Sequence, residues 1–162
     1  MKKSTLAVTT LAAAAAAVSG SIANPRSVSN WYSHIRKPSY QPPSAAFPVV
    51  WTALYGDIAA TSAEAIDRFR AAGQNDKARG YVGALGVNLA LNAGWSWLFF
   101  RYHKLGASAL GAAALTVSSA DLARRAADAH PRAGAALAPY PLWCAFATAL
   151  STHIWLLNRT NS

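Results

Sequence analysis

Five long apolar segments, separated by short clusters rich in Arg, Lys, Gly and Pro, constrain the fold of this chain more than any other feature. Each segment is about 20 residues long, which is the length that a helix needs to cross the hydrocarbon core of a bilayer. Lipid offers no hydrogen-bond partner to backbone N–H and C=O groups, so only helices and closed barrels can span it. The segments lack the alternation of barrel strands. The sequence therefore predicts an all-α integral membrane bundle of five transmembrane helices.

We expect these helices at about residues 5–23, 47–66, 81–100, 105–122 and 133–157 of a single membrane domain over residues 1–162, with a lid loop over residues 24–46. The composition supports burial in lipid, because 53% of the residues are hydrophobic and only 13% are charged, about half the charged share of an ordinary soluble domain. A soluble alanine-rich bundle is the alternative, since alanine is barely apolar and the mean hydropathy is only +0.16.

The first segment has a second interpretation. Lys2-Lys3, the apolar stretch from Leu6 to Val18 and the small residues before Asn24 also describe a secretory signal peptide. A cleaved signal would leave four helices, whereas retention gives five. The Lys-Lys start and the high Ala and Arg content fit a bacterial inner membrane, with a mitochondrial or other organellar membrane as the alternative.

Charge, cysteine and histidine patterns exclude several function classes. The formal charge is +9, but the basic residues are scattered through the connectors in runs no longer than a pair, so we expect no nucleic-acid partner. Asp121 is expected to pair with Arg124 and Arg125 on one helix face. The lone Cys144 excludes an intrachain disulfide and multi-cysteine metal motifs. The histidines show no metal-ligand spacing, so no metal site is expected.

Rings and amides recur at helical spacing on three of the expected helices. They are Trp51 and Tyr55 on the second, Asn88, Asn92 and Trp95 on the third, and Tyr140, Trp143 and Ala147 on the fifth. Residues three or four apart share a helix face, so each set projects together. Such residues can also merely fill space, pair helices or anchor at headgroup depth. Their coincidence with a loop stiffened by Pro38, Pro42 and Pro43 favours a covered pocket.

Several short motifs surround these residues. They are Trp31-Tyr32, Lys37-Pro38-Ser39 with Pro42-Pro43, Trp51-Thr52-Ala53-Leu54-Tyr55, Leu91-Asn92 with Trp95-Ser96 and Leu98-Phe99-Phe100, and Pro139-Tyr140 with Trp143 and Ala145 to Leu150. Together they resemble the TspO/translocator protein family, also called tryptophan-rich sensory proteins, over residues 31–158. The resemblance implies a five-helix membrane bundle, usually dimeric, that binds porphyrins such as protoporphyrin IX, haem in some members, and sterols or benzodiazepine-type ligands in others.

The resemblance also implies which residues bind the ligand. It places Trp31, Trp51, Asn92 and Trp143 around a pocket under the first loop, and the spacing adds Tyr55 and Ala147. A tetrapyrrole is a broad π-system with two propionates, so the rings would stack on it and the amide would donate a hydrogen bond. Arg36 or Lys37 would pair with a propionate, the alternative being a solvated or headgroup-facing charge.

Function then divides into three hypotheses. The first is a membrane sensor or carrier that holds a tetrapyrrole as its ligand and requires no further cofactor. The second, also implied by the resemblance, is light-dependent porphyrin degradation with radicals on Trp31 and Trp143. We favour binding, because porphyrin is itself a photosensitiser. Sterol or lipid transport is disfavoured, since His153 and Leu156 stand where the sterol motif needs Tyr and a Lys or Arg. A further departure is Tyr40, where the family usually has a tryptophan.

Two features of the helices have alternative interpretations. Gly86, Ala90 and Gly94 form a small-residue stripe that permits close helix approach, either inside one monomer or in the homodimer that the resemblance implies. Asp57 is a carboxylate well inside the second helix, where charge is costly. It would contact a proton or ligand, or it would be a protonated acid that is hydrogen-bonded to a neighbouring helix.

Overall fold

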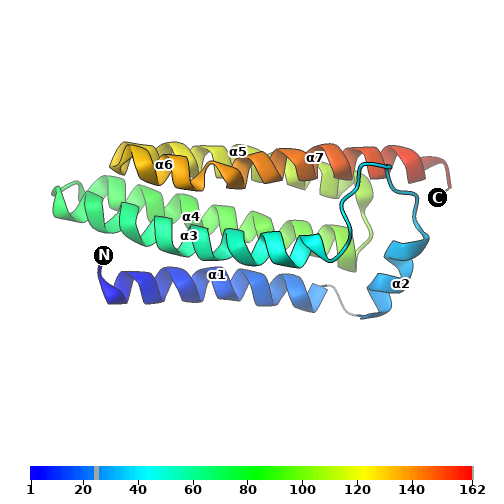
Figure 1. Ribbon diagram of the computed structural model, residues 1–162, viewed down its shortest axis with the longest axis horizontal. Coiled ribbons are helices and arrows are strands. Elements are labelled where there is room, and N and C mark those ends of the chain that lie inside the picture. Colours follow the sequence, from blue (N-terminus) through cyan, green and yellow to red (C-terminus); the bar gives the residue numbers. More distant parts are fainter. Residues whose placement is uncertain (24–25, 162) are drawn as a thin grey trace.

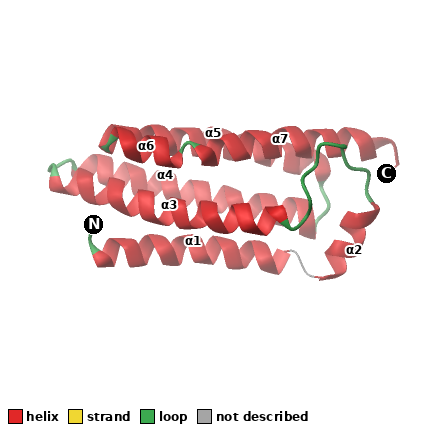
Figure 2. Ribbon diagram, viewed as in Figure 1, coloured by secondary structure: helices red, strands yellow, loops and turns green. Residues whose placement is uncertain are grey.

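The computed structural model describes residues 1–23 and 26–161, and these residues form an all-α bundle. Four long helices and a fifth rod made of two consecutive helices lie roughly side by side (Figure 1). The elements are α1 (Lys3–Ala23), α2 (Arg26–His34), α3 (Ala46–Ala71), α4 (Asn75–Ser96), η1 (Trp97–Arg101), α5 (Leu105–Ala129), α6 (Pro131–Leu137), α7 (Pro139–Asn158) and η2 (Arg159–Asn161). Loops in the described part of the chain join the ends of the rods (Figure 2). The prediction of an all-helical bundle is confirmed.

Three stretches of the described chain are both long and apolar enough to cross a membrane. They are α1, α5 and the stretch Pro131–Asn158, which consists of α6 followed by α7. Helices α3 and α4 are comparably long, with 26 and 22 residues. They pack against each other and against α1 and α5. Five rods of membrane-spanning length therefore make up the bundle.

The distribution of polarity is that of a lipid-exposed protein. Large apolar side chains point outward, among them Leu11 and Leu110, which are 70% and 75% exposed. By contrast, Asn88 and Asn92 are 0% and 1% exposed inside the bundle. A soluble bundle would place these residues the other way round, because exposed apolar area in water and buried amides are both costly. This arrangement argues against a soluble alanine-rich bundle.

The helices extend past the apolar segments from which we predicted them. Helix α3 continues to Ala71 rather than 66, α4 begins at Asn75 rather than 81, and α5 continues to Ala129 rather than 122. The added turns are rich in charged residues, which end an apolar window without breaking a helix. The apolar segments therefore indicate which part of each helix suits the hydrocarbon core of a bilayer, and they do not indicate where the helix ends.

The predicted lid loop over residues 24–46 is partly helical, which corrects that prediction. Helix α2 occupies Arg26–His34, while residues 24–25 lie outside the described part of the chain. The side-chain amine of Lys37 donates to the carbonyls of Tyr32 and Ile35, which are among the carbonyls at the C-terminal end of this helix. Among the described residues of this range, 35–45 form a non-helical connection that contains two turns, and we call this segment the lid.

The single helix predicted over residues 133–157 is also corrected, because two helices take its place. Helix α6 ends at Leu137, a turn follows at Ala138, and α7 begins at Pro139. Proline lacks an amide hydrogen and its ring clashes with the preceding turn, so Pro139 and Pro141 interrupt the hydrogen-bond ladder there. The break leaves Tyr140 and Trp143 in the first turns of a new helix.

The first segment packs as a member of the bundle. Helix α1 lies along α3 and α4. Its buried Thr9 hydroxyl donates to the carbonyl of Ala59 at 2.8 Å, and its Thr5 hydroxyl donates to the carboxylate of Asp67 at 2.7 Å. Polar contacts between helices thus accompany the small alanine side chains on this face.

Replacing Gly134 by alanine tests the close approach of α6 to α5. A Cβ at Gly134 would lie 2.8 Å from the Cα of Ala127 on α5, so α6 would have to move away. We expect Gly134→Ala to destabilise the protein by about 1–3 kcal/mol, measured by thermal unfolding in detergent. The control is Gly83→Ala, where nothing lies within 4 Å of the added Cβ. Equal losses in the two variants would contradict this packing.

Candidate ligand-binding site

A cavity of about 460 Å³ lies at the end of the bundle covered by the lid. Its walls come from α1, α3, α4, η1 and α7, and Tyr32 and Ser44 approach it from α2 and the lid. The volume falls in the range of about 300–1,000 Å³ that small-molecule sites occupy. The lining is mostly aromatic and aliphatic, with a few amide and hydroxyl groups. It is therefore suited to a large, flat apolar ligand with some polar atoms.

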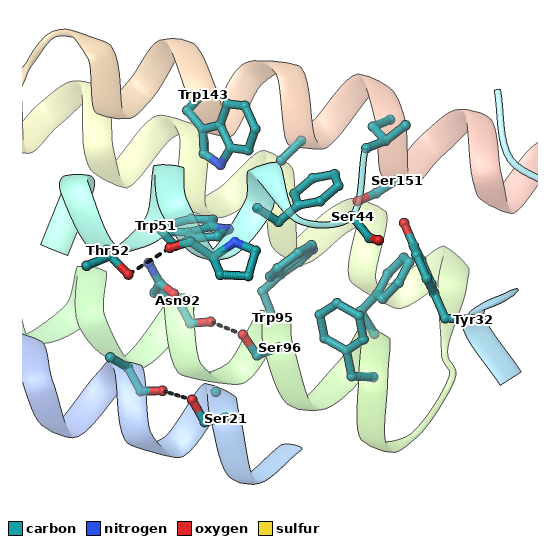
Figure 3. A pocket seen from close by; sticks show the side chains of 18 of the residues that line it. Ser21, Tyr32, Ser44, Trp51, Thr52, Asn92, Trp95, Ser96, Trp143 and Ser151 are labelled. Carbon is teal, nitrogen blue, oxygen red and sulfur yellow. Dashed lines mark hydrogen bonds between the residues drawn. The ribbon is translucent and has the colours of Figure 1, made fainter. Parts of the chain in front are cut away.

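Helical spacing explains why these side chains converge. Each wall is a set of residues three or four apart, which share one face of their helix. The sets are Ala17, Gly20 and Ser21 on α1, Trp51 and Tyr55 on α3, Asn92, Trp95 and Ser96 on α4, and Trp143, Ala147, Leu150, Ser151 and Ile154 on α7. Figure 3 shows Trp51, Trp95 and Trp143 converging on the cavity from three different helices.

A π-helical turn at the end of α4 completes one wall. In η1 the amide of Tyr102 donates to the carbonyl of Trp97, five residues earlier, at 3.0 Å. The wider turn accommodates an extra residue and lets the adjacent Phe99 and Phe100 both line the cavity. Their ring centroids lie 4.9 Å apart in an edge contact.

Trp51 is the centre of the aromatic wall. Its ring centroid lies 6.4 Å from those of Trp95 and Tyr140 and 6.5 Å from that of Trp143. Tyr55, one turn further on α3, is 5.8 Å away. Such tilted and edge contacts are favourable for aromatic rings, and they hold the flat faces of the wall in fixed orientations.

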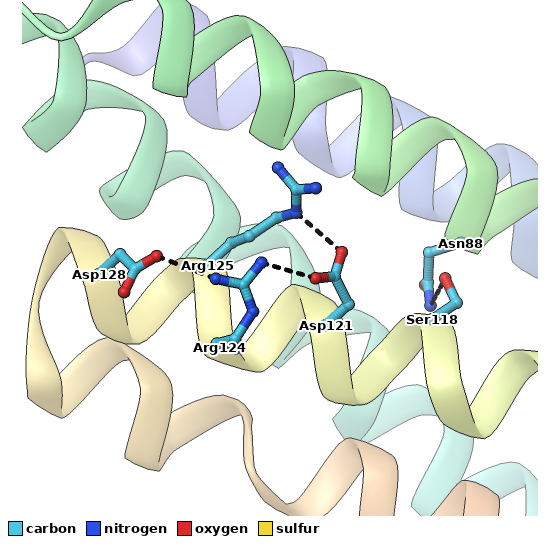
Figure 4. A network of polar contacts seen from close by, with 6 residues as sticks. All are labelled: Asn88, Ser118, Asp121, Arg124, Arg125 and Asp128. Carbon is cyan, nitrogen blue, oxygen red and sulfur yellow. Dashed lines mark hydrogen bonds and ion pairs between the residues drawn. The ribbon is translucent and has the colours of Figure 1, made fainter.

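A directed chain of hydrogen bonds, which we call the polar floor, begins at Tyr55 and Asn92 in the cavity wall and continues into the interior of the bundle. Tyr55 Oη donates to Asn92 Oδ1 at 2.8 Å, Asn92 Nδ2 to Tyr140 Oη at 3.1 Å, and Tyr140 Oη to Asn88 Oδ1 at 2.8 Å. Asn88 Nδ2 then donates to Ser118 Oγ at 3.2 Å on α5 (Figure 4). Buried amides need such partners, and each donor polarises the next. The chain ties together α3, α4, α7 and α5.

This chain determines which polar atoms remain for a ligand. The side-chain oxygen of Asn92 accepts from Tyr55, and one of its two N–H groups donates to Tyr140. The second N–H of Asn92 therefore remains available to a ligand. The proton of the Tyr55 hydroxyl is committed to Asn92, so its lone pairs remain. Within the described residues, the buried indole N–H groups of Trp95 and Trp143 have no partner. The site thus offers the N–H donors of Asn92, Trp95 and Trp143 beside hydroxyl groups whose lone pairs can accept.

The structure brings most of the expected site residues together. Trp51, Tyr55, Asn92, Trp143 and Ala147 all line the cavity. Sequence reasoning omitted Tyr32, Phe99 and Phe100 from this site. Their only sequence signal was membership of the motifs that carry the family resemblance.

Trp31 lies apart from this group. Its ring stacks on the imidazole of His103 at a centroid distance of 3.7 Å and an interplanar angle of 7°. It also packs edge-on against Phe99, which lines the cavity. His103 has a positive φ of 55°, a left-handed backbone that non-glycine residues rarely adopt. The Trp31 ring therefore supports the wall from behind and is not among the residues that line the cavity.

The two candidate propionate partners differ in their surroundings. The Lys37 amine is held by the carbonyls of Tyr32 and Ile35 and lies 4.7 Å above the Tyr32 ring. Arg36 is exposed on the lid, and its backbone is bonded to Asn158. Arg36 thus has the more accessible side chain for an anionic group.

The remaining candidates lie away from the cavity. Gly86, Ala90 and Gly94 are on an exposed face of α4, and a Cβ added at either glycine meets nothing within 4 Å. The stripe therefore faces outward rather than toward another helix of the same bundle. Asp57 is half-buried and accepts a hydrogen bond from Thr61 on its own helix at 2.9 Å.

The expected ion pair of Asp121 is confirmed. Arg124 Nη2 and Arg125 Nε each lie 2.8 Å from one of its carboxylate oxygens, and Arg124 also contacts Asp128 at 3.3 Å (Figure 4). The pairs lie near the C-terminal end of α5, remote from the lid. Exposed pairs of this kind contribute little to stability, because water and salt screen them.

Sequence comparisons agree with this architecture. A model of the TspO/MBR family matches residues 7–156. The chain belongs to the TspO/MBR family. Relatives include the protein CrtK of Rhodobacter capsulatus, which is 30% identical over 158 residues, covering 98% of this chain and 95% of the relative. The tryptophan-rich protein TspO of Archaeoglobus fulgidus is 32% identical over 153 residues, covering 94% and 96%. The human translocator protein is 32% identical over 131 residues, covering 80% and 75%.

Family membership and the apolar outer face together identify an integral membrane protein. The match to the family model includes most of α1 as well as the aromatic segments, since it begins at residue 7. The cavity residues on α3, α4 and α7 all lie inside the matched region. The family assignment thus applies to the part of the chain that builds the site.

Tyr140→Phe tests the polar floor. Loss of the hydroxyl would leave Asn88 Oδ1 and one Asn92 N–H without a partner inside the bundle. We expect a loss of about 1–3 kcal/mol in unfolding free energy, measured in detergent. Tyr81→Phe is the matched control, because within the described residues the Tyr81 hydroxyl has one hydrogen-bond partner, the Ser62 hydroxyl, and a helical serine can turn to a backbone carbonyl of its own helix. If the control lost as much stability, the bridging role of Tyr140 would be wrong.

Proposed function

We propose that this protein binds a tetrapyrrole, such as protoporphyrin IX or haem, in the cavity under the lid and acts as a membrane sensor or carrier of that ligand. The observation that supports this most directly is the cavity of about 460 Å³ walled by Trp51, Trp95 and Trp143. A tetrapyrrole is a wide π-system, and indole rings from three helices offer it stacking surfaces. The composition favours a bacterial inner membrane as the location.

The polar atoms of the site suit the edges of such a ligand. The indole N–H groups of Trp95 and Trp143, and the spare N–H of Asn92, are donors for carboxylate or carbonyl oxygens. The lone pairs of the Tyr55 hydroxyl can accept from the O–H of a protonated propionic acid group, since the pyrrole N–H groups of a porphyrin point to the centre of its ring and not to its edge. A ligand with both kinds of group would satisfy donors that are otherwise buried without partners.

The charge distribution supports an anionic ligand. All acidic residues lie on α3, α4 or α5, from the middle of α3 towards the end remote from the lid: Asp57, Glu64, Asp67, Asp76, Asp121 and Asp128. Arg36, Lys37, Arg101 and Lys104 lie at the lid end. The opposite end holds nine basic residues among the acidic ones and is mixed in sign, whereas the basic residues at the mouth of the cavity have no acidic residue among them, so the mouth is positive. A field of this sign attracts the propionates of a porphyrin.

Light-dependent porphyrin degradation is a second candidate. It is favoured by the contact of Trp143 with Trp51, at 6.5 Å, in series with Trp95 at 6.4 Å, because neighbouring rings can share an oxidising equivalent. Trp31 is less well placed for this chemistry, since its ring lies behind Phe99. A binding protein returns its porphyrin unchanged, whereas an enzyme converts several equivalents under light.

A homodimer through α4 is part of the proposal. Gly86, Ala90 and Gly94 face outward from the monomer and leave the backbone of α4 approachable. In lipid, where apolar helix faces gain little by association, close backbone packing over small residues is what joins helices. The human relative is named a translocator protein, which is compatible with a carrier role here.

Protoporphyrin IX in the dark should quench tryptophan fluorescence of the detergent-solubilised protein with saturation. Trp51→Phe and Trp143→Phe each remove part of the stacking surface and should raise the Kd about 2- to 10-fold. Trp155→Phe is the control, since Trp155 is 38% exposed and does not line the cavity. The absence of saturable binding would overturn the tetrapyrrole assignment. Conversion of more than one porphyrin equivalent per protein under illumination, lost in Trp143→Phe, would favour the enzyme.

Leucine at Gly86 and Gly94 should disrupt the proposed dimer. The larger side chains would hold two α4 backbones apart, so the monomer fraction in bilayers should rise, as measured by single-molecule photobleaching. Ala114→Leu, on an exposed face of α5, adds similar bulk elsewhere and should leave the dimer intact. A dimer that tolerates both glycine substitutions would show that α4 is not the interface.

A further inference from the structure

The lid is fastened to the last helix by the side chain of Asn158. Asn158 Oδ1 accepts a hydrogen bond from the Arg36 backbone N–H at 3.0 Å, and Asn158 Nδ2 donates to the Arg36 carbonyl at 2.8 Å. One amide side chain thus satisfies both backbone groups of a single lid residue, as a neighbouring strand would. Asn158 is the last residue of α7, and the same Nδ2 also donates to Ile154 in the helix itself. The bond to Ile154 within α7 fixes the orientation of the Asn158 amide toward the lid.

A second contact joins the middle of the lid to α7. The Tyr40 hydroxyl and His153 Nδ1 are hydrogen-bonded at 3.1 Å, and the two rings lie 5.6 Å apart. The Tyr40 ring also packs edge-on against Phe146 at 6.3 Å. Tyr40 and His153 are two of the positions at which this chain departs from the family pattern, and they contact each other.

The lid is stiff between its ends. Pro38, Pro42 and Pro43 fix the backbone φ angle at three of its positions. The backbone N–H of Gln41 donates to the Pro38 carbonyl at 3.2 Å, and the backbone N–H of Ala46 donates to the Pro43 carbonyl at 2.9 Å. A segment braced internally in this way moves as a unit. Its position over the cavity then depends on what fastens it to the neighbouring helix.

The fastening contacts are separate from the ligand contacts. Asn158, His153 and Tyr40 do not line the cavity, whereas Ser44 of the lid does. The hydrogen bonds of Asn158 to Arg36 and of Tyr40 to His153 are solvent-exposed. Exposed hydrogen bonds exchange readily with water, so their net contribution is small. They can hold the lid closed most of the time and still release it.

We propose that Asn158, together with the Tyr40 and His153 pair, latches the lid over the cavity and sets the rates at which a ligand enters and leaves. These residues are positioning residues, since they act through the lid. The ligand part of this inference rests on the proposed function, but the closing of the cavity does not. If the closed lid gates passage in both directions, weakening the latch accelerates association and dissociation together and leaves the Kd nearly unchanged.

The latch can be tested without a ligand. Ser151 lines the cavity, so Ser151→Cys in a Cys144→Ser background places a single thiol under the lid. Its rate of labelling by a small methanethiosulfonate reagent measures how often the cavity opens. Asn158→Leu, which removes both hydrogen bonds, should raise this rate about tenfold. Asn158→Asp, which keeps only the acceptor, and Tyr40→Phe, which keeps only the ring, should give smaller increases.

Two controls separate opening of the lid from loss of stability. Ser39→Ala changes an exposed lid residue outside the latch and should label at the parent rate. Gly134→Ala strains the packing of α6 on α5 and leaves the latch contacts in place. If Gly134→Ala accelerated labelling as much as Asn158→Leu, exposure would reflect general unfolding and the latch would be wrong. Parent-like labelling in Asn158→Leu would also overturn it.

Stopped-flow quenching by protoporphyrin IX then tests the kinetic role. In Asn158→Leu, both rate constants should rise by similar factors, about tenfold, with the Kd within about twofold of the parent. Trp51→Phe should show the opposite pattern, a raised Kd without faster association. An unchanged dissociation rate in Asn158→Leu would overturn the gating role. If protoporphyrin IX does not bind the parent, the proposed function fails, while the labelling experiment still decides whether the latch exists.

Discussion

The hydroxyl of Tyr140 is the point on which the interior of this bundle depends. It accepts from Asn92 and donates to Asn88, both on α4, while Asn92 and Asn88 extend the chain to Tyr55 on α3 and Ser118 on α5. Four helices meet at this chain. Inside a membrane no water is available to hydrogen-bond these amides. Any other helix arrangement would therefore have to provide other hydrogen-bond partners for them. The chain thereby selects one register of the helices among the many that packing of alanine-rich faces would allow.

The same constraint positions the cavity. Tyr140 is in the first turn of α7, directly after the break at Ala138, and Trp143 follows three residues later on the same face. With Tyr140 fixed against α4, the Trp143 ring has to lie beside Trp51. The large rings near the lid prevent the helices from closing fully above the polar floor. The cavity is thus the space left between a hydrogen-bonded floor and rings too large to interdigitate.

Much of this architecture was predictable from the sequence, because hydropathy and helical spacing depend on residues close in the chain. The five rods followed from apolar segments of bilayer length, and the convergence of Trp51, Asn92 and Trp143 followed from spacing and the family resemblance. The break at Ala138 was harder to place, since Pro139 and Pro141 suit the first turn of a helix as well as an interruption. The length of α3 was missed because Arg68 and Arg70 end an apolar window and still form helix.

Other features depend on contacts between distant residues and had no local signal. Helix α2 is only nine residues long, too short to be stable alone, and its rings pack on η1 through Phe99 and Phe100. The place of Trp31 depends on the left-handed backbone of His103, about 70 residues later in the chain. The pairing of Tyr40 with His153 likewise joins two positions that looked like separate departures from a family pattern.

The free-energy cost of breaking the hydrogen bonds differs between the polar floor and the lid end of the cavity. At the floor, separating Tyr140 from its asparagines would leave buried amide groups without partners, at about 1–3 kcal/mol for each group. At the lid, the hydrogen bonds to Asn158 and His153 are exposed, so water replaces them with little net loss. Movement should therefore be confined to the lid end. A ligand that needs an opening wider than the closed structure provides would enter there, past Arg36 and Tyr40, and not between the helices that the polar floor holds together.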